Sequence, residues 1–447
     1  MKKKLSIALA AAMASSVIGA IPAMADEPTV IKYWTNDRHD SEYMQEVVDK
    51  FNEENDDVQI EMTIITDNYE TMISTAITGG TGPDIVDGHS INLSNFAAAD
   101  LIIPITDYVA ADEEYQKVNE PYTHKYEGKN AIGDDIYWVY SGVRSGVRIE
   151  YNKDLLEASG FDGIPTSLEE YVDMAKKITE DGNGDTYGIG LTSSWQVGRL
   201  VEPVAQVSGV TYYDYKNGCF NFDGYKEILE LFKRLIDEDI AYPDQQAVDN
   251  MRALFAGGEF ALWANASQEY GVFTQQLPIE DFDWGVGLVP SLTGEVKGAL
   301  SIDPQKAFAI MSSCEDPDAA WKVIEYLQSE DVLKGYLEGG YCLPLSTYMA
   351  DTIDSSKIGK LADFSLVDYE TVYPAAPNIN LSGDDCYAVM WNVINGYVDV
   401  DEAIEDLNTR YNEALEADVA SGSCKRLVIE DYDPMHPDQG TCTYLDK

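Results

Sequence analysis

Strand-like and helix-like patterns of hydrophobic residues alternate in the first part of the chain. Apolar residues run together in 30–34, recur at helical spacing through 41–54, and alternate with polar residues in 58–64. The helical spacing returns in 69–77, and a short apolar run follows at 83–86. Alternating strands and helices predict an α/β fold with parallel strands.

The same alternation resumes downstream. Residues 166–170 (Thr-Ser-Leu-Glu-Glu) have the composition of a capping box, so we predict that a helix starts there. Helical spacing of apolar residues also marks 225–236, 317–327 and 401–416. From Ser421 onward the pattern breaks into a tail that contains Gly, Pro and Asp, and we find no internal repeat.

Size and charge narrow the class of protein. At roughly 150 residues per domain, 447 residues indicate two or three domains. The chain has 79 acidic and 30 basic residues, a formal net charge of −49. Such a surface repels phosphate backbones and anionic lipid, so we expect no nucleic-acid partner and no membrane-surface role. The composition fits a secreted, highly soluble protein.

The first residues have the layout of a secretory signal peptide. Three lysines at 2–4 precede an apolar stretch over 5–21, and Ala23-Met24-Ala25 supplies small residues before Asp26. We therefore predict a signal peptide over 1–25 and export to the periplasm or cell surface; a membrane anchor is the alternative. The residue directly after the predicted cleavage site is Asp26 and not cysteine, so we expect no lipid attachment there. No later segment reaches the ~20 apolar residues that span a bilayer.

Six cysteines lie beyond the signal peptide. An even number in an exported protein permits disulfides, and six cysteines allow about 15 pairings. Cys424 and Cys442 both lie in the short tail and are the first pair that we expect. Buried thiols are the alternative, because a core of this size needs no covalent staple.

Ten short motifs occur in a fixed order between about Val30 and Ala420. They are Tyr33-Trp34, Phe51–Glu54, Gly79–Val86, Leu101–Ile105, Ile136–Val139, Tyr151–Leu155, Pro165–Tyr171, Phe255–Leu262, Ala319–Trp321 and Gly340–Pro344. Each is weak alone, but their order over nearly the whole chain resembles the extracellular solute-binding proteins of ABC importers, in the branch that includes maltose-type sugar-binding proteins.

That resemblance implies an α/β, two-lobed periplasmic-binding-protein fold of type II, with hinge strands and a ligand cleft between the lobes. The chain is expected to cross between lobes near 137–140, 287–290 and 341–344. The implied division is a signal peptide (1–25), lobe 1 (26–138 plus 289–342), lobe 2 (139–288 plus 343–420) and a tail (421–447). A ligand that touches both lobes favours the closed form, which a separate membrane permease recognises. We expect a monomer.

The resemblance points to a sugar or oligosaccharide as the ligand. Aromatic rings stack on the C–H patches of a sugar, and short polar side chains or arginine bind its hydroxyls. This chain places such residues after predicted strands and near the expected crossings. The candidate ligand-binding residues are Trp34, Asp37, Arg38, Asp87, His89, Trp138, Tyr140, Trp195, Trp263, Asn265, Gln268 and Asp303.

By resemblance, Asp37 and Arg38 match polar residues that follow the first strand, and Trp195 matches an aromatic stacking position. Gln268 falls where relatives commonly have a stacking tryptophan, and Trp263 is a candidate substitute. The residues after 83–86 depart from the maltose-type pattern, which has a tryptophan there. The identity of the ligand therefore stays open.

Structural interpretations compete with these assignments. Trp34, at a strand end, suits a core position as well as a ligand-facing one. Asp37 and Asp87 suit helix caps as well as ligand contacts. Arg144 and Arg148 suit ion pairs with local acids better than a carboxylated ligand.

Residues 181–185 resemble the start of a calcium loop, with Asp181, Asn183 and Asp185 as candidate ligands. The loop lacks glycine at its sixth position, and Thr192 stands where a bidentate glutamate belongs. A plain acidic turn is the alternative, and we expect no other cofactor.

Two other functions compete with sugar capture. A secreted hydrolase is the enzyme alternative, but Gly88–Asn92 lacks the last glycine of a nucleophile elbow, and the four histidines form no zinc motif. We therefore expect a protein that is not an enzyme. The second alternative is a cationic solute such as a polyamine or amino sugar, bound by Asp37, Asp87 and Asp303.

Overall fold

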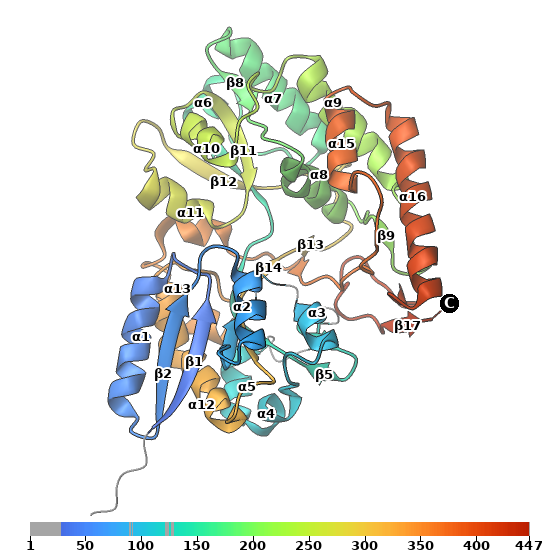
Figure 1. Cartoon of the computed structure of the whole chain (residues 1–447). Helices are drawn as coiled ribbons and strands as arrows, with labels where there is room; N and C mark the ends of the chain where they lie inside the picture. The colour runs from blue at the N-terminus through green and yellow to red at the C-terminus, as the bar shows by residue number, and fades with distance from the viewer. Residues whose placement is uncertain (1–27, 89–90, 92, 121–124, 127–128, 447) are drawn as a thin grey trace, which may run out of the picture.

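The computed structural model describes residues 28–88, 91, 93–120, 125–126 and 129–446. Within them the chain forms two lobes, each built around its own sheet, and Figure 1 shows several segments crossing between the lobes. This arrangement confirms the predicted two-lobed α/β fold.

Lobe 1 contains a five-stranded sheet in the order β2-β1-β3-β14-β6. Strand β1 pairs in parallel with β2 and β3, whereas β14 is antiparallel to β3 and β6. The strands of the sheet are β1 (Thr29–Thr35), β2 (Val58–Ile64), β3 (Ile85–Asp87), β6 (Val139–Arg144) and β14 (Asp303–Ile310). A small hairpin of β4 (Ala131–Ile132) and β5 (Asp135–Ile136) directly precedes β6 along the chain.

Helices surround this sheet, with α1 beside β2, and α12 beside β1 and β14. The helices of lobe 1 are α1 (Ser41–Glu54), α2 (Tyr69–Thr78), α3 (Leu93–Ala98), α4 (Thr106–Ala111), α5 (Glu113–Asn119), α12 (Pro317–Leu327), α13 (Glu330–Glu338) and α14 (Thr347–Thr352). Trp321 of α12 is buried in the lobe 1 core.

Lobe 2 contains a four-stranded sheet in the order β12-β7-β11-β8. Strand β7 is antiparallel to both neighbours, and β11 is parallel to β8. These strands are β7 (Arg148–Asn152), β8 (Tyr187–Ile189), β11 (Phe260–Asn265) and β12 (Trp284–Leu288). Short pairs elsewhere are β9 (Tyr213–Asp214) with β10 (Cys219–Phe220), and β13 (Leu300–Ser301) with β15 (Glu370–Thr371).

A layer of helices packs on this second sheet, with α7 beside β8, α8 beside β11, and α9 against α7, α15 and α16. The helices are α6 (Lys153–Ala158), α7 (Leu168–Gly182), α8 (Trp195–Val207), α9 (Lys226–Asp237), α10 (Val248–Ala256), α11 (Glu269–Gly271), α15 (Cys386–Ile394) and α16 (Val400–Ser421), with short turns η1 (Asp223–Tyr225), η2 (Val272–Gln276) and η3 (Gly359–Phe364).

Capping side chains set where several helices begin, as the sequence predicts. The Ser167 hydroxyl accepts a hydrogen bond from the Glu170 amide at the start of α7. The Asp316 carboxylate accepts one from the Ala319 amide, with Pro317 as the first residue of α12. The helices predicted over 41–54 and 401–416 are observed as α1 and α16.

The lobe boundaries differ from the predicted ones. Strand β6 (139–144) pairs with β14 in the lobe 1 sheet, and α14 packs against α5 and α13 of lobe 1. In contrast, β13 pairs with β15 and packs against α8 of lobe 2. The chain therefore crosses at 145–147, near Ile302, and after Thr352. Strand β6 before the first crossing and strand β14 after the second pair with each other in the lobe 1 sheet, and this pairing is not encoded in local sequence.

The C-terminal residues pack on lobe 2. Strands β16 (Arg426–Val428) and β17 (Thr443–Leu445) form a hairpin, and Leu427 and Ile429 are fully buried in the lobe 2 core. The predicted tail is therefore a structured addition to lobe 2.

The expected disulfide between Cys424 and Cys442 does not form; the six cysteines, all in the described part of the chain, are thiols. The register pairs Arg426 with Leu445 and Val428 with Thr443, so Cys424 and Cys442 lie toward opposite ends of the hairpin. A disulfide needs two Cα atoms within about 7 Å.

The predicted signal peptide, residues 1–25, lies outside the described residues. None of the helices in the described ranges combines the length and the apolar character needed to cross a bilayer.

Candidate ligand-binding cleft

A cavity of about 340 Å³ lies between the two lobes. Lobe 1 contributes His39, Arg144 and the segment 339–342 to its wall, and lobe 2 contributes Ser267 and Gln268. Its lining is about half polar and half apolar, and its volume falls in the range of about 300–1,000 Å³ that is usual for small-molecule sites. A larger depression of about 830 Å³ beside Tyr108 and Trp321 is lined by lobe 1 alone.

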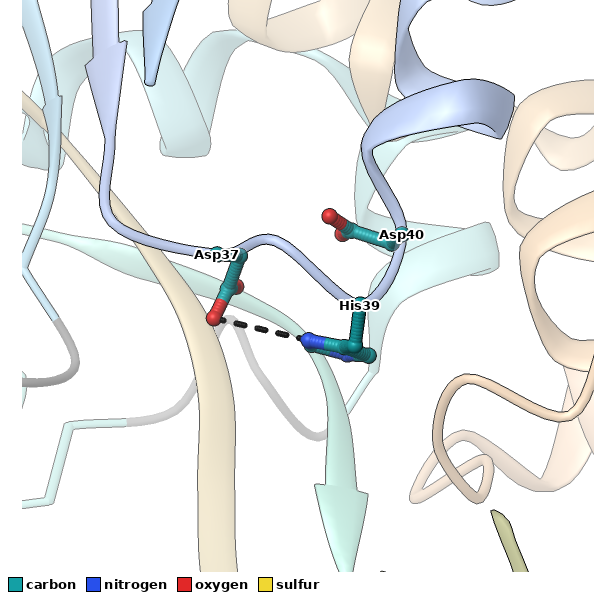
Figure 2. Close-up of side chains that lie close together, drawn as sticks. All are labelled: Asp37, His39 and Asp40. Atoms are coloured by element: carbon teal, nitrogen blue, oxygen red, sulfur yellow. Dashed lines mark ion pairs between the residues drawn. The ribbon is translucent and has the colours of Figure 1, made fainter. Parts of the chain in front are cut away.

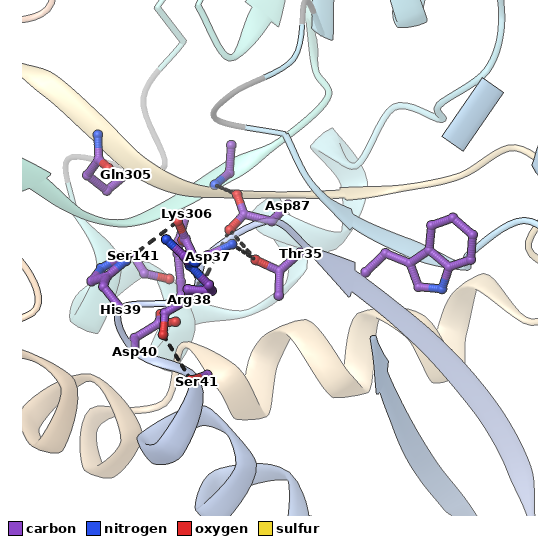
Figure 3. Close-up of polar contacts among 12 residues, drawn as sticks. Thr35, Asp37, Arg38, His39, Asp40, Ser41, Asp87, Ser141, Gln305 and Lys306 are labelled. Atoms are coloured by element: carbon purple, nitrogen blue, oxygen red, sulfur yellow. Dashed lines mark hydrogen bonds and ion pairs between the residues drawn. The ribbon is translucent and has the colours of Figure 1, made fainter. Parts of the chain in front are cut away.

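A buried charge cluster, shown in Figure 3, lies in lobe 1 next to His39, one of the residues that line the cavity. The Lys306 Nζ atom lies 2.7 Å from Asp40 Oδ2, 3.1 Å from Asp37 Oδ2 and 3.5 Å from Asp87 Oδ2. All four side chains are buried. We call these residues (Asp37, Asp40, Asp87 and Lys306) the Lys306 cluster. Its carboxylates come from the loop after β1 and from the end of β3, so three distant segments meet here.

Backbone and hydroxyl groups hold the Lys306 cluster in place. The Asp87 carboxylate accepts hydrogen bonds from the Ala307 amide at 3.0 Å and from the Thr35 hydroxyl at 3.2 Å. Lys306 has φ +51°, in the left-handed region that residues with a side chain seldom adopt. The pairing of β14 with β6 continues on both sides, with Gln305 opposite Gly142 and Ala307 opposite Tyr140.

His39 lies at the edge of this cluster. Its Nδ1 atom is 3.7 Å from Asp37 Oδ1 (Figure 2), and possible ligand atoms of Asp37, His39 and Asp40 all lie within 4.8 Å of one another. This spacing suits a metal ion. However, the Lys306 ammonium already contacts both carboxylates, so the place of a cation is taken by a side chain.

Trp195, the first residue of α8, belongs to lobe 2 and lies outside the lining of the cavity. Its side chain is 41% exposed, and the Arg199 guanidinium lies 5.2 Å from the ring centre. Arg199 interacts electrostatically with Asp303 and Arg144 of lobe 1, so this end of α8 faces the other lobe. Burial lowers the pKa of the Arg199 guanidinium, and Asp303 opposes that effect.

A buried network supports the loop after β11. The Asn265 amide donates to Glu269 Oε1 at 2.7 Å, and Arg252 Nη2 lies 2.6 Å from the same oxygen. Gln268 in turn donates to Asn265 Oδ1. Asn265 is fully buried, so its polar atoms shape the loop, whereas Gln268 and Ser267 line the cavity.

Three predicted ligand-binding aromatics are buried instead of facing the cleft. Trp138, Tyr140 and Trp263 are 2%, 6% and 0% exposed. Trp138 donates through Nε1 to the Tyr140 hydroxyl, which donates to the Lys129 carbonyl. Trp263 lies on β11 directly opposite the buried Glu150 of β7. All three rings belong to the core that runs between the sheets, Tyr140 from β6, Trp263 from β11 and Trp138 from the residue before β6, so their burial does not support a role as ligand contacts.

Three other predicted residues that the structure describes, Trp34, Arg38 and Asp303, belong to lobe 1. Trp34 is partly buried, packs on the same core, and accepts a hydrogen bond from the Tyr69 hydroxyl through its carbonyl. Arg38 is exposed on the loop after β1. Asp303 is exposed at the start of β14, 3.8 Å from Arg144. His89 lies outside the described residues.

The sequence did not predict three of the cavity-lining residues, His39, Arg252 and Tyr341. It also did not predict two charged residues near the cavity, Arg199 and Lys306. Lys306 had the clearest signal, because it is a positive charge directly before the apolar run Ala307-Phe308-Ala309-Ile310. A buried lysine requires acidic partners. The two arginines carried a weaker signal, as scarce positive charges in an acidic chain.

The structure also bears on the alternatives for Arg148 and for the proposed calcium loop. Arg148 forms a buried, two-pronged ion pair with Glu370, through Nη1 at 2.9 Å and Nη2 at 2.7 Å, as expected for a partner of a local acid. In the proposed calcium loop, the Asp181 carboxylate pairs with Lys177. The Asn183 amide nitrogen donates to the Asp181 carbonyl. These contacts add no support for calcium, which stays a prediction.

Comparisons with known proteins agree with this architecture. Residues 36–334 match the family model of bacterial extracellular solute-binding proteins. The chain is 24% identical over 295 residues to the maltotriose-binding protein of Pyrococcus abyssi, covering 64% of this chain and 59% of the relative. The alignment thus spans less than two thirds of that relative's length.

Solved structures show the same fold. The apo form of RafE from Streptococcus pneumoniae superposes with a TM-score of 0.68 at 17% identity, covering 87% of this chain and 99% of that one. The sugar-binding protein MalE from Xanthomonas citri gives 0.66 at 21% identity, covering 87% and 98%. Because the family model covers well over half of the chain, this protein belongs to the bacterial extracellular solute-binding proteins.

Proposed function

We propose that this protein captures a sugar or oligosaccharide between its lobes and delivers it, chemically unaltered, to the permease of an ABC importer. The observation that carries the proposal is the cavity lined by both lobes, with His39 and Arg144 on one side and Ser267 and Gln268 on the other. A ligand that bridges such walls stabilises the closed arrangement.

The chemistry of the walls suits hydroxyl-rich ligands. Gln268, Ser267 and Arg144 supply amide, hydroxyl and guanidinium groups to the cavity. The exposed indole of Trp195, at the end of α8 that faces lobe 1, is the aromatic surface available for a sugar ring. Related proteins bind sugars: the Pyrococcus abyssi relative binds maltotriose, and the Xanthomonas citri neighbour is a sugar-binding protein.

The cationic alternative finds less support. Two of the three aspartates proposed to bind a polyamine, Asp37 and Asp87, contact the Lys306 ammonium. The third, Asp303, is near the Arg144 guanidinium. Carboxylates that already face a positive charge gain little from a second cation, so an uncharged ligand fits these walls better.

The cellular setting belongs to the same proposal. We infer that residues 1–25 direct export and are removed, that the mature protein works as a monomer outside the cytoplasm, and that its partner is a membrane permease on a separate chain. The family match to extracellular proteins supports this setting.

A thermal-shift screen of the purified mature protein tests the function. Glucose, maltose, maltotriose and raffinose are compared with spermidine at equal concentration, since a ligand that binds only the native state raises the melting temperature. We expect at least one saccharide to stabilise the protein. Stabilisation by spermidine with no response to any saccharide would overturn the proposal.

A further inference from the structure

Next to His39, which lines the cleft, Lys306 occupies the position at which three buried aspartates of lobe 1 would otherwise attract a cation. Its ammonium lies within 3.5 Å of carboxylate oxygens of Asp37, Asp40 and Asp87. The lysine side chain is 2% exposed, and those of the aspartates are 10%, 1% and 0% exposed. Carboxylates removed from water need a positive charge close by, because an unpaired buried ion is costly.

The backbone is built to deliver the ammonium to this place. Lys306 adopts φ +51° within β14, a backbone conformation that is strained for a residue with a side chain. The next residue, Ala307, donates its amide to Asp87, and Gly88 donates its amide to the Ala307 carbonyl. The backbone around Lys306 is therefore held by the end of β3, and β3 also supplies Asp87, one of the carboxylate partners of Lys306.

Without the ammonium, the remaining groups have the composition of a cation site. Oxygen atoms of Asp37 and Asp40 and a ring nitrogen of His39 lie within 4.8 Å of one another, and Asp87 lies on the other side of the lysine (Figure 3). Carboxylate oxygens are the ligands that divalent cations and ammonium groups prefer. Lobe 1 thus holds an acidic pocket and its own counter-ion together, beside the cavity-lining His39.

We propose that Lys306 is a specificity-determining residue, an internal counter-ion that closes this pocket to ammonium groups and metal ions and thereby makes the cleft reject cationic solutes. This inference rests on the proposed function, because it concerns which solutes the same cleft accepts. It predicts that the three aspartates behind His39 give the protein no affinity for cations.

The test uses titration calorimetry of the mature protein with putrescine and, separately, with calcium chloride at physiological salt. Wild type is compared with Lys306→Met, which keeps the length of the apolar stem. The matched control is Lys322→Met. It makes the same charge change at an exposed ion pair, that of Lys322 with Asp57, which is not part of the Lys306 cluster. The control reports cation binding that arises only from the acidic surface.

We expect Lys306→Met to bind at least one of the two cations tenfold or more tightly than wild type and Lys322→Met do. Adding Asp37→Asn to Lys306→Met should remove most of that gain. A folded Lys306→Met protein that binds neither cation better than Lys322→Met would overturn the inference. Sugar-dependent stabilisation of wild type is scored separately, so failure of the proposed function is distinguishable from failure of this inference.

A second comparison does not depend on the fold of the lysine variant. Wild type and Asp37→Asn are titrated with the same two cations, with Lys306 in place in both proteins. Equal cation binding supports the inference, because the pocket is then closed. Wild-type binding that falls tenfold in Asp37→Asn would show that the pocket is open to cations and would contradict it.

Discussion

Val143 and Leu343 exchange two backbone hydrogen bonds, from the Val143 amide to the Leu343 carbonyl at 2.9 Å and back at 2.8 Å. Val143 lies in β6, the last strand before the first crossing into lobe 2. Leu343 lies in the segment that lines the cleft through Gly340 and Cys342. These two hydrogen bonds therefore join the strand before the first crossing to the segment that lines the cleft, so a displacement of one is expected to displace the other.

The neighbours of that pair predict a steric effect. A Cβ atom added at Gly142 would lie 2.0 Å from the Cys342 Sγ atom, and Cys342 is itself buried. We expect Gly142→Ala to lower the free energy of unfolding by about 1–3 kcal/mol, the usual cost of overpacking. Thermal unfolding followed by circular dichroism measures the change.

The double variant Gly142→Ala/Cys342→Ala provides the control. Removing Sγ leaves the closest contacts of the new Cβ at 3.1 Å, to Cys342 Cβ and the Leu343 carbonyl oxygen. The double variant should recover part of the loss. Equal destabilisation of Gly142→Ala in both backgrounds would show that the clash with sulfur is not the cause.

Trp195→Ala is expected to weaken sugar binding by about 1–3 kcal/mol, the scale of an aromatic anchor at an interface. The fold should change little, because the indole is 41% exposed. The measurement is titration calorimetry with the saccharide that stabilises wild type most. Tyr397→Ala removes a 78% exposed ring elsewhere and serves as the control. Unchanged affinity in Trp195→Ala would place the ligand away from α8.

The ion pair of Arg148 and Glu370 predicts a large loss of stability when one partner is removed. Glu370 also accepts hydrogen bonds from the Gly146 and Val367 amides. Arg148→Met leaves this buried carboxylate without its cation, which typically costs about 3–5 kcal/mol. Urea unfolding measures the loss.

A double-mutant cycle with Glu370→Gln then isolates the pairing. We expect the double variant to lose less than the sum of the two single variants. Strict additivity would mean that the two groups do not stabilise each other.

Glu202 predicts a pH dependence of stability. Burial raises its pKa to about 7, although hydrogen bonds from Tyr225 and Gln206 oppose the rise. Above the ordinary pKa of 4.5 the unfolded chain loses this proton while the folded protein keeps it. The contribution of Glu202 is therefore fully present below pH 4.5 and is lost as the pH rises through 7, a decrease of about 3 kcal/mol.

Glu202→Gln tests this by removing the titration while keeping an acceptor for Tyr225. Urea unfolding at several pH values between 4.5 and 7.5 is compared for wild type and variant. The stability of the variant relative to wild type should rise by about 3 kcal/mol across that range. Glu413→Gln, at an exposed site on α16, should show no such trend; parallel curves for wild type and Glu202→Gln would contradict the assignment.

Local sequence determined the elements of this protein and their order. The helical spacing in 41–54 and the Ser167 cap are visible in a few neighbouring residues, because helices depend on contacts three or four positions apart. The motif order was sufficient to predict the two lobes. Composition alone led to the expectation of no nucleic-acid partner and no membrane-surface role, since charge is counted without a structure.

Tertiary structure decided which chemistry faces the cleft. The sequence suggested a stacking role for both Trp195 and Trp263. In the structure Trp195 begins α8 and is exposed, whereas Trp263 lies on β11 and is fully buried. Asp37, Asp87 and Lys306 meet only because β1, β3 and β14 are neighbours or near neighbours in one sheet. Burial and ion pairing depend on contacts between distant segments, such as Asp37 and Lys306, which are 269 positions apart, and no local pattern records them.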